Sequence, residues 1–203
     1  MILSKIIELL LSNPLLYKLH AAGVDRSKFD AIRNIRADFS GLKVLDLGCG
    51  PGNTASIFSG SDYTGVDINA RYIKRAAEKY PQYKFIIGDA GRVQWGSGFD
   101  IILINSFFHH LNDNEVVQVA KSAVSALSSG GMVIVQEALV PEKKEIYHRL
   151  MMKLDRGNYF RAIEQWEKLL GQAGLVPDQV DYYYLRVMGI RGYHMVSLCL
   201  IAG

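Results

Sequence analysis

Three glycines at alternate positions could bind a ligand through the bare backbone. Gly48, Gly50 and Gly52 lie in the segment 43–53, Lys-Val-Leu-Asp-Leu-Gly-Cys-Gly-Pro-Gly-Asn. They follow a short apolar run at 44–47, which is typical of a buried central strand. Glycines at this spacing allow a sharp turn and let a ligand approach the main chain. The pattern predicts a nucleotide-type binding corner at the carboxyl end of the strand.

Asp67 adds a second feature to this corner, because it closes the next apolar run, at 63–67. An acid at the end of that strand can accept hydrogen bonds from both hydroxyls of a ribose. Asn53 stands where a dinucleotide-binding turn has its third glycine, which argues against a pyrophosphate held at the helix start. The glycine turn and the distant acid therefore favour a ribose-containing ligand that lacks a pyrophosphate.

Three segments of the chain resemble the motifs of class I methyltransferases that use S-adenosylmethionine. They are Val-Leu-Asp-Leu-Gly-Cys-Gly-Pro-Gly at 44–52, Gly-Val-Asp-Ile-Asn at 65–69 and Gly-Asp-Ala at 88–90. The resemblance covers nearly the whole chain and is closest to a small bacterial type whose substrate is unassigned. It implies that S-adenosylmethionine is the cofactor.

The resemblance also implies which residues meet that cofactor. The glycines would shape the pocket for its methionine part, Asp67 would bind the ribose, and Asp89 and Ala90 would meet the adenine. Asn105, at the end of the fourth strand, would lie under the methionine end. The full set of expected cofactor residues is Asp46, Gly48, Cys49, Gly50, Gly52, Asp67, Ile68, Asp89, Ala90, Asn105 and Ser106.

His109 and His110 are the candidate catalytic residues. Methyl transfer from a sulfonium is an in-line displacement, so the protein mainly has to align the reacting atoms. A hydroxyl or amine acceptor can also need a base, and histidine titrates near neutrality. Both histidines follow the fourth strand, close to the expected position of the methyl group. The alternative is that a histidine orders this loop or packs under the cofactor; of the two, His109 is expected to lie nearer the site.

Candidate acceptor-binding residues come from two segments. Tyr17 and His20 belong to the leading segment, while Arg156, Tyr159 and Arg161 belong to the sequence Leu-Asp-Arg-Gly-Asn-Tyr-Phe-Arg at 154–161. The arginines could hold a carboxylate or phosphate, and the tyrosine offers a ring or a hydroxyl. Two alternatives stay open: the leading helices only pack on the sheet, and Asp155 pairs with the arginines to shape the loop.

Other features narrow the chemistry. Asn-Ser-Phe-Phe at 105–108 departs from the Asn/Asp-Pro-Pro-Tyr/Phe motif used to methylate exocyclic nitrogens, and the net charge is only +3. A nucleic-acid partner is therefore not expected. No cluster of carboxylates suggests a metal, so we expect none. Cys49 and Cys199 are far apart and lack a metal-binding spacing, which argues against a disulfide or zinc site.

The elements that must position these residues alternate along the chain. Apolar runs predict parallel strands at 44–47, 63–67, 83–87, 99–104 and 132–135, and two more strands at 180–187 and 193–201 form a hairpin. Helices are expected at 27–38, 70–79, 141–154 and 163–173, and another before a break at Pro14. Two more are expected to begin at a capping residue: one at Asn53 or Thr54, running through Phe58, and one at Asn112 or Asp113, running through Leu127. The expected fold is α/β: a Rossmann-like, seven-stranded, mostly parallel sheet with helices on both faces and a terminal antiparallel hairpin.

A chain of 203 residues is expected to form one methyltransferase domain, 1–203. Within it we expect a helical N-terminal lid at 1–40, a cofactor-binding core at 41–140, and a substrate-side insertion with the last strands at 141–203. The apolar run in 1–19 is too short and too charged to span a membrane. We expect a cytoplasmic monomer or homodimer.

The predicted function is methyl transfer to a small-molecule acceptor of lipid, sugar or polyketide type, at oxygen, nitrogen or carbon. The absence of an added recognition domain within these residues favours a compact acceptor. Two alternatives are an RNA or protein methyltransferase, which would need a positive groove beside the cofactor, and a non-catalytic regulatory subunit that only binds S-adenosylmethionine.

Overall fold

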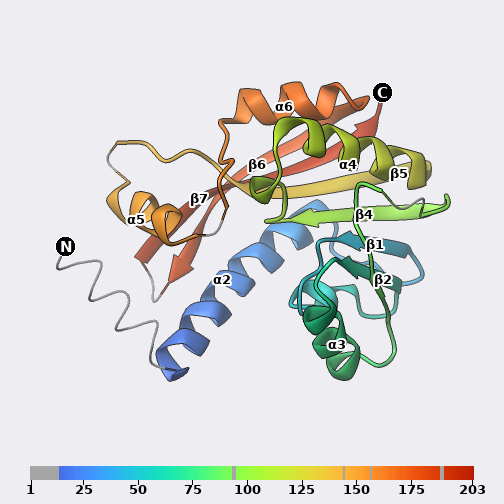
Figure 1. The fold of residues 1–203 in the computed structure, drawn as a ribbon, viewed down its shortest axis with the longest axis horizontal. Coiled ribbons are helices and arrows are strands. Elements are labelled where there is room, and N and C mark those ends of the chain that lie inside the picture. Colours follow the sequence, from blue (N-terminus) through green and yellow to red (C-terminus); the bar gives the residue numbers. More distant parts are fainter. Residues whose placement is uncertain (1–13, 93–94, 144, 156, 188–189) are drawn as a thin grey trace.

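A computed structural model describes residues 14–92, 95–143, 145–155, 157–187 and 190–203 (Figure 1). The helix expected before Pro14, the first part of the expected lid segment and the candidate residue Arg156 lie outside these ranges. Tyr17 and His20 lie within the first described helix, but their side chains are also outside the described part of the structure.

Seven strands form a single sheet in the order β3-β2-β1-β4-β5-β7-β6. The strands are β1 Lys43–Leu47, β2 Asp62–Asp67, β3 Lys84–Ile87, β4 Phe99–Asn105, β5 Leu127–Ala138, β6 Leu175–Val187 and β7 Ile190–Ala202. The first five pair in parallel, whereas β7 runs antiparallel to both β5 and β6. This topology confirms the predicted sheet with its terminal antiparallel hairpin, and it brings the carboxyl ends of β1, β2 and β4 to one edge.

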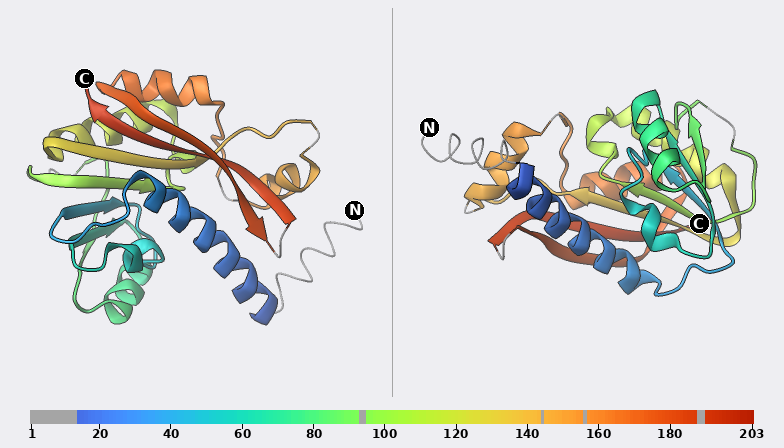
Figure 2. Two further views of the ribbon diagram at one scale, coloured as in Figure 1. Left: turned by 180° about the vertical axis from the view of Figure 1, so that it is seen from behind. Right: turned by 90° about the horizontal axis from the view of Figure 1, so that it is seen from below.

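Helices cover both faces of this sheet (Figures 1 and 2). They are α2 Pro14–Ile35, α3 Ala70–Lys79, α4 Asp113–Ala126, α5 Ile146–Leu154 and α6 Ile163–Gly171, with short 3-10 helices η1 Thr54–Phe58 and η2 Phe108–His110. Successive side chains of a strand point to opposite faces of the sheet, so β4 contributes side chains to two hydrophobic cores. Ile102 and Ile104 pack in the core that contains Val116 of α4 and Trp166 of α6. Ile101 and Leu103 pack in the core that contains Ile32 of α2.

Two of the expected helix starts are confirmed in detail. The Asn69 side chain accepts hydrogen bonds from the backbone amides of Arg71 and Tyr72 at the start of α3. Asn112 and Glu115 form a reciprocal capping box at the start of α4. These caps fix the first turn of each helix directly after the loops that follow β2 and β4.

The prediction of an ordinary α-helix, capped by Asn53 or Thr54, after the glycine turn is wrong. Residues Thr54–Phe58 form a 3-10 helix, and the Asn53 side chain makes no capping hydrogen bond. The Thr54 hydroxyl instead donates to Asp46 at 2.7 Å, so it is not available as a cap either. Only residues 59–61 separate η1 from β2, and this short connection leaves no room for a longer helix.

Other element boundaries also differ from those expected. The helix expected at 27–38 is the second half of a longer one, α2, which runs from Pro14 to Ile35; proline is tolerated in the first turn of a helix. β5 begins at Leu127, where it pairs with Phe99, whereas the glycines that follow suggested the end of a helix. The hairpin strands are longer than expected at both ends of their pairing. Among the described helices, none combines the length and apolar character needed to span a membrane.

Candidate active site

The glycine turn adopts the backbone that its sequence requires. Gly48, Gly50 and Gly52 have φ of 79°, 54° and 77°, in the left-handed region that favours glycine. A Cβ on Gly48 would lie 2.6 Å from the Phe107 ring, whereas a Cβ on Gly50 would meet nothing within 4 Å. The turn thus packs tightly against the loop after β4 at one end and presents open backbone to a ligand at Gly50. Cys49 is buried, which raises the pKa of its thiol, and it serves as a small packing residue.

Asp46 lies beneath the glycine turn with only 1% of its surface exposed. Its Oδ2 accepts hydrogen bonds from Thr54 Oγ1 at 2.7 Å and from the Tyr63 hydroxyl at 2.6 Å. Burial raises the pKa of Asp46 to about 6, although these two hydrogen bonds oppose the rise. The described contacts of Asp46 are internal, so within this structure it supports the turn from below.

Asp67 connects β2 to the glycine turn. Its Oδ2 accepts a hydrogen bond from the Gly50 amide at 3.0 Å, and its Oδ1 accepts one from the Asn69 amide at 2.8 Å. Ile68 beside it is 74% exposed, and Ile87, paired with Asp67 across β2 and β3, is 58% exposed. Two bare apolar side chains beside a carboxylate form a surface suited to a flat base and its ribose. Ile87 was not predicted; its place at the end of the third strand was the available signal.

The residues expected to meet the adenine, Asp89 and Ala90, lie directly after the end of β3. Asp89 accepts a hydrogen bond from the Gly91 amide at 2.9 Å and forms a partly exposed ion pair with Arg92 at 3.2 Å. Ala90 is buried, and its carbonyl accepts a hydrogen bond from the Trp95 indole at 3.4 Å. The structure therefore places both residues on the same side as Asp67, within a loop that is fixed by its own hydrogen bonds.

The end of β4 carries a strained residue. Ser106 has φ of 52°, and it is the non-glycine residue with positive φ in the described chain. Its hydroxyl donates to Asn105 Oδ1 at 3.3 Å and accepts a hydrogen bond from Lys28 Nζ at 2.7 Å. Strained backbone of this kind persists where surrounding contacts enforce it, as at functional sites. Lys28 thereby joins α2 to the end of β4, a role that no sequence signal indicated.

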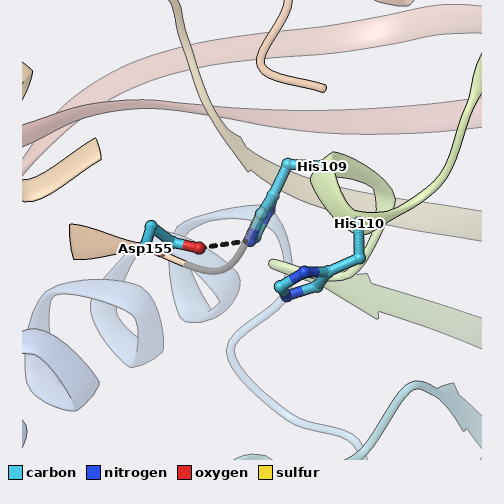
Figure 3. A group of neighbouring side chains, drawn as sticks. All are labelled: His109, His110 and Asp155. Atoms are coloured by element: carbon cyan, nitrogen blue, oxygen red, sulfur yellow. Dashed lines mark ion pairs between the residues drawn. The ribbon is translucent and has the colours of Figure 1, made fainter. Parts of the chain in front are cut away.

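His109 is held between two carboxylates. Its Nδ1 lies 2.6 Å from Glu137 Oε2, and its Nε2 lies 3.7 Å from Asp155 Oδ1 (Figure 3). Glu137 is fully buried at the end of β5, and its Oε1 also accepts the amides of Phe107 and Phe108. Burial lowers the pKa of His109, but the two carboxylates outweigh it and raise that pKa above its ordinary value. Glu137 was missed by sequence reasoning, although a glutamate in an apolar strand was a usable signal.

His110 is exposed and stands beside His109, with 4.2 Å between the ring centroids. Among the described residues, His109, His110 and Asp155 offer three potential metal-binding atoms within 4.8 Å of one another (Figure 3). Lys28 also interacts electrostatically with Asp155 and Glu137 and offsets part of their negative charge. We interpret the group as a polar cluster of paired charges.

The segment after α5 is fixed to His109 through the backbone. The amides of Asn158 and Tyr159 donate to the His109 carbonyl at 3.1 and 3.0 Å. The Gly157 amide donates to Asp155 Oδ1 at 2.7 Å, which orients that carboxylate. Tyr159 is 42% exposed, and the described contact that it makes with the histidine is through its backbone amide. Asp155 was considered only as a loop partner, yet it lies at the centre of the cluster.

The guanidinium N–H groups of Arg161 already donate hydrogen bonds to other parts of the protein. The residue is 4% exposed, and its Nε and Nη2 both donate to Asp113 Oδ1, at 2.9 and 2.7 Å. It also donates to the carbonyls of Leu111 at 2.8 Å and Tyr159 at 2.9 Å. These contacts favour the alternative in which the arginine shapes the loop rather than binds the acceptor.

Replacing Arg161 by methionine is therefore expected to destabilise the fold by about 2–3 kcal/mol. The carbonyls that it serves would lose a charged donor, and hydrogen bonds to charged groups contribute roughly 1.5–3 kcal/mol. Urea denaturation followed by circular dichroism measures this loss. Arg149→Met is the matched control, because Arg149 is exposed on α5 and the change should cost less than about 0.5 kcal/mol. Unchanged stability with a higher KM would restore Arg161 as an acceptor-binding residue.

A cavity of about 340 Å³ opens beside the polar cluster. Its polar lining residues are Ser106, His109, His110, Asp155 and Lys28, and its other lining residues are Ala138, Phe160, Leu185, Met195 and Tyr193. The structure brings both candidate catalytic residues, His109 and His110, into this cavity, together with Ser106, which was expected to meet the cofactor. Tyr159 and Arg161 are not among its lining residues.

A doubly covered α/β sheet with a glycine turn and an acid at the ends of adjacent parallel strands defines a Rossmann-like, nucleotide-binding class of protein. The family described as "Methyltransferase domain" matches residues 44–131. A trans-aconitate 2-methyltransferase of Rhodopseudomonas palustris is 31% identical over 151 residues, which are 70% of this chain and 54% of that protein. A 2-methyl-6-phytyl-1,4-hydroquinone methyltransferase of Synechocystis is 29% identical over 69% of this chain and 48% of that protein.

The fold comparison agrees. The crystal structure of magnesium protoporphyrin IX methyltransferase from Synechocystis with bound SAH matches with a TM-score of 0.70 and 18% identity. The match covers 94% of this chain and 88% of that one. Over residues 44–131 the chain thus matches the methyltransferase domain family, and its fold is that of the methyltransferase structure it resembles. It spans about half the length of the curated relatives it matches, 55% and 54% for two of them.

Proposed function

We propose that this chain binds S-adenosylmethionine at the carboxyl ends of β1, β2 and β4 and transfers its methyl group to a small molecule. The observation that carries the proposal is the contact between the Gly50 amide and Asp67 Oδ2, at 3.0 Å. It joins the bare turn to the carboxylate that would accept the ribose hydroxyls. Exposed Ile68 and Ile87 supply an apolar surface for the adenine.

The cavity beside His109 supports a small acceptor. Its volume of about 340 Å³ lies at the lower end of the range of small-molecule pockets, about 300–1,000 Å³. Asn105 and Ser106 lie between the glycine turn and this cavity in the order of the sheet, so cofactor and acceptor would meet at the end of β4. The matched relatives are named as methyltransferases of small molecules, which agrees with this assignment. The cytoplasmic location and the monomeric or homodimeric state remain predictions.

Titration calorimetry with S-adenosylmethionine and a transfer assay with methyl-labelled cofactor test the proposal together. We expect saturable binding, and transfer of label to an acceptor from a small-molecule panel. Cofactor binding with transfer of label to RNA or protein, and to no small molecule, would show that the acceptor is a macromolecule instead of a small molecule. Absence of binding would remove the function altogether.

Asp67→Ala is expected to weaken cofactor binding about 10- to 100-fold. The ribose would lose a charged partner, and such hydrogen bonds contribute about 1.5–3 kcal/mol, where 1.4 kcal/mol is tenfold. Calorimetry measures the change directly. Asp62→Ala is the matched control, because Asp62 is an exposed acid at the opposite end of the same strand. Equal affinities of the wild type and the Asp67 variant would contradict the ribose assignment.

A further inference from the structure

The acceptor's chemical class can be inferred from the charges at the polar end of the cavity. Asp155 lines the cavity, and Glu137 lies directly behind His109. The basic groups that accompany them are His109 and Lys28, whose Nζ donates to Ser106 Oγ at 2.7 Å. When His109 is neutral, as a base must be, the single positive charge of Lys28 faces two carboxylates, so this end of the cavity has no excess of positive charge. A carboxylate acceptor would add a third negative group to this end and would be repelled by Asp155.

The orientation of His109 adds a second argument. Its Nδ1 is committed to Glu137 at 2.6 Å, so Nδ1 carries the proton in the neutral ring and Nε2 presents a lone pair. Nε2 lies on the side of Asp155, which together with His109 lines the cavity. A base held in this way serves only an acceptor that still carries its proton at neutral pH. Carboxylic acids have already lost theirs, since their pKa is about 4, whereas phenols titrate near 10.

The apolar residues of the cavity lining favour an acceptor with an apolar ring. Ala138, Leu185 and Met195 are buried side chains that line the cavity. Phe160 stacks on the His109 imidazole, with ring centroids 5.1 Å apart and planes 12° from parallel. A flat aromatic acceptor can lie along these groups with its hydroxyl at Nε2, and the cavity volume of about 340 Å³ suits one substituted ring or a fused pair.

We propose that the acceptor is a neutral hydroxyl compound on an apolar ring, of the phenol type, and that His109 accepts its proton. This inference rests on the proposed function. The hydroxyl oxygen forms its bond to the methyl carbon as the carbon–sulfur bond of the donor breaks. The hydroxyl proton passes to His109 Nε2 and later to solvent, and the products are a methyl ether and S-adenosylhomocysteine. Lys28, which also lines the cavity, offsets the negative charge that develops on the oxygen.

The pH dependence of turnover follows from the groups that face His109. They are Glu137 on β5, Asp155 after α5, Lys28 on α2, His110 on η2 and Tyr193 on β7, whose hydroxyl lies 3.4 Å from Asp155. Since the base must be neutral to accept a proton and its pKa is raised, turnover should rise with pH through a value above 6.5. Asp155→Asn removes one cause of that rise, so its midpoint should move to lower pH.

A matched acceptor panel tests the proposal. Phenol and 2-naphthol are compared with benzoate and 2-naphthoate, using the full chain and methyl-labelled S-adenosylmethionine. We expect kcat/KM for the hydroxyl compounds to exceed that for the acids at least about 10-fold. Preferential transfer to the acids would overturn the inference while leaving the methyltransferase function intact. Transfer to neither pair by protein that binds the cofactor would reject the phenol class, and failure to bind the cofactor would reject the proposed function itself.

The pH profile supplies the second measurement, on the better hydroxyl acceptor. Asp155→Asn should lower the midpoint of the acidic limb relative to the wild type. Glu167→Gln is the matched control: it removes one carboxylate from an exposed position on α6, away from the cavity, and should leave the midpoint unchanged. An Asp155→Asn limb that coincides with that of the wild type would show that His109 is not the group being titrated.

Discussion

Replacing His109 by glutamine is expected to lower kcat by about 10²- to 10⁴-fold, the range typical for loss of a general base. Glutamine retains a polar side chain of similar reach but cannot accept a proton at neutral pH. The buried Glu137 would keep its two backbone donors, the amides of Phe107 and Phe108, so the loop after β4 should remain in place. Steady-state kinetics at saturating cofactor measure the effect.

Two further measurements separate catalysis from structure in this variant. Calorimetry should give a cofactor affinity within about twofold of the wild type, because the described contacts of Gly50 and Asp67 do not involve His109. His110→Gln is the matched comparison: His110 is exposed, whereas His109 is buried against Glu137, so we expect a much smaller loss. If the two variants lost activity equally, or if His109→Gln kept full kcat, His109 would be a structural residue.

The cofactor corner could be predicted from the sequence because its parts are local. The glycine turn needs only neighbouring residues to define it, and its positive φ angles follow from the absence of a side chain. Asp67 could be placed because strand length and parallel topology put the ends of β1 and β2 side by side. Asn69 and Asn112 could be assigned as caps for the same reason: each acts within three residues.

The acceptor end could not be predicted to the same degree, because its contacts join distant parts of the chain. Lys28 reaches Ser106 across 78 residues, and Glu137 reaches His109 across 28. Arg161 seemed free to bind an anion in the sequence, but the fold brings Asp113 to it from 48 residues away. A pattern of residue types carries no information on such pairings until the order of the strands is known.

The same argument explains the error in the helix after the glycine turn. Asn53 and Thr54 are good capping residues by type, and that local preference predicted an ordinary helix start. The buried Asp46 carboxylate, which also accepts a hydrogen bond from Tyr63, recruits the Thr54 hydroxyl instead, since a buried carboxylate with fewer hydrogen bonds costs more free energy than an unformed cap. A buried tertiary hydrogen bond thus outweighed a helix-capping preference.

Gly157→Ala is expected to reduce kcat strongly while leaving cofactor binding intact. A Cβ at this position would overlap the His109 ring and lie 3.1 Å from its carbonyl oxygen. His109 or the segment that holds Asp155 must therefore move, and a displacement of about 1 Å in a catalytic group can cost on the order of 10²-fold. The overpacked site should also lose about 1–3 kcal/mol of stability. Kinetics, calorimetry and urea denaturation measure the three quantities.

Gly171→Ala is the matched control for that change. Gly171 ends α6, does not have a positive φ, and a Cβ there would meet nothing within 4 Å. Alanine should leave kcat unchanged and be neutral or slightly stabilising, by up to about 1 kcal/mol. A Gly157 variant with wild-type kcat would mean that the segment at 155–159 does not fix His109. The glycine in Leu-Asp-Arg-Gly-Asn-Tyr-Phe-Arg would then have no part in placing the base, and the role of that motif would have to be sought on its exposed side.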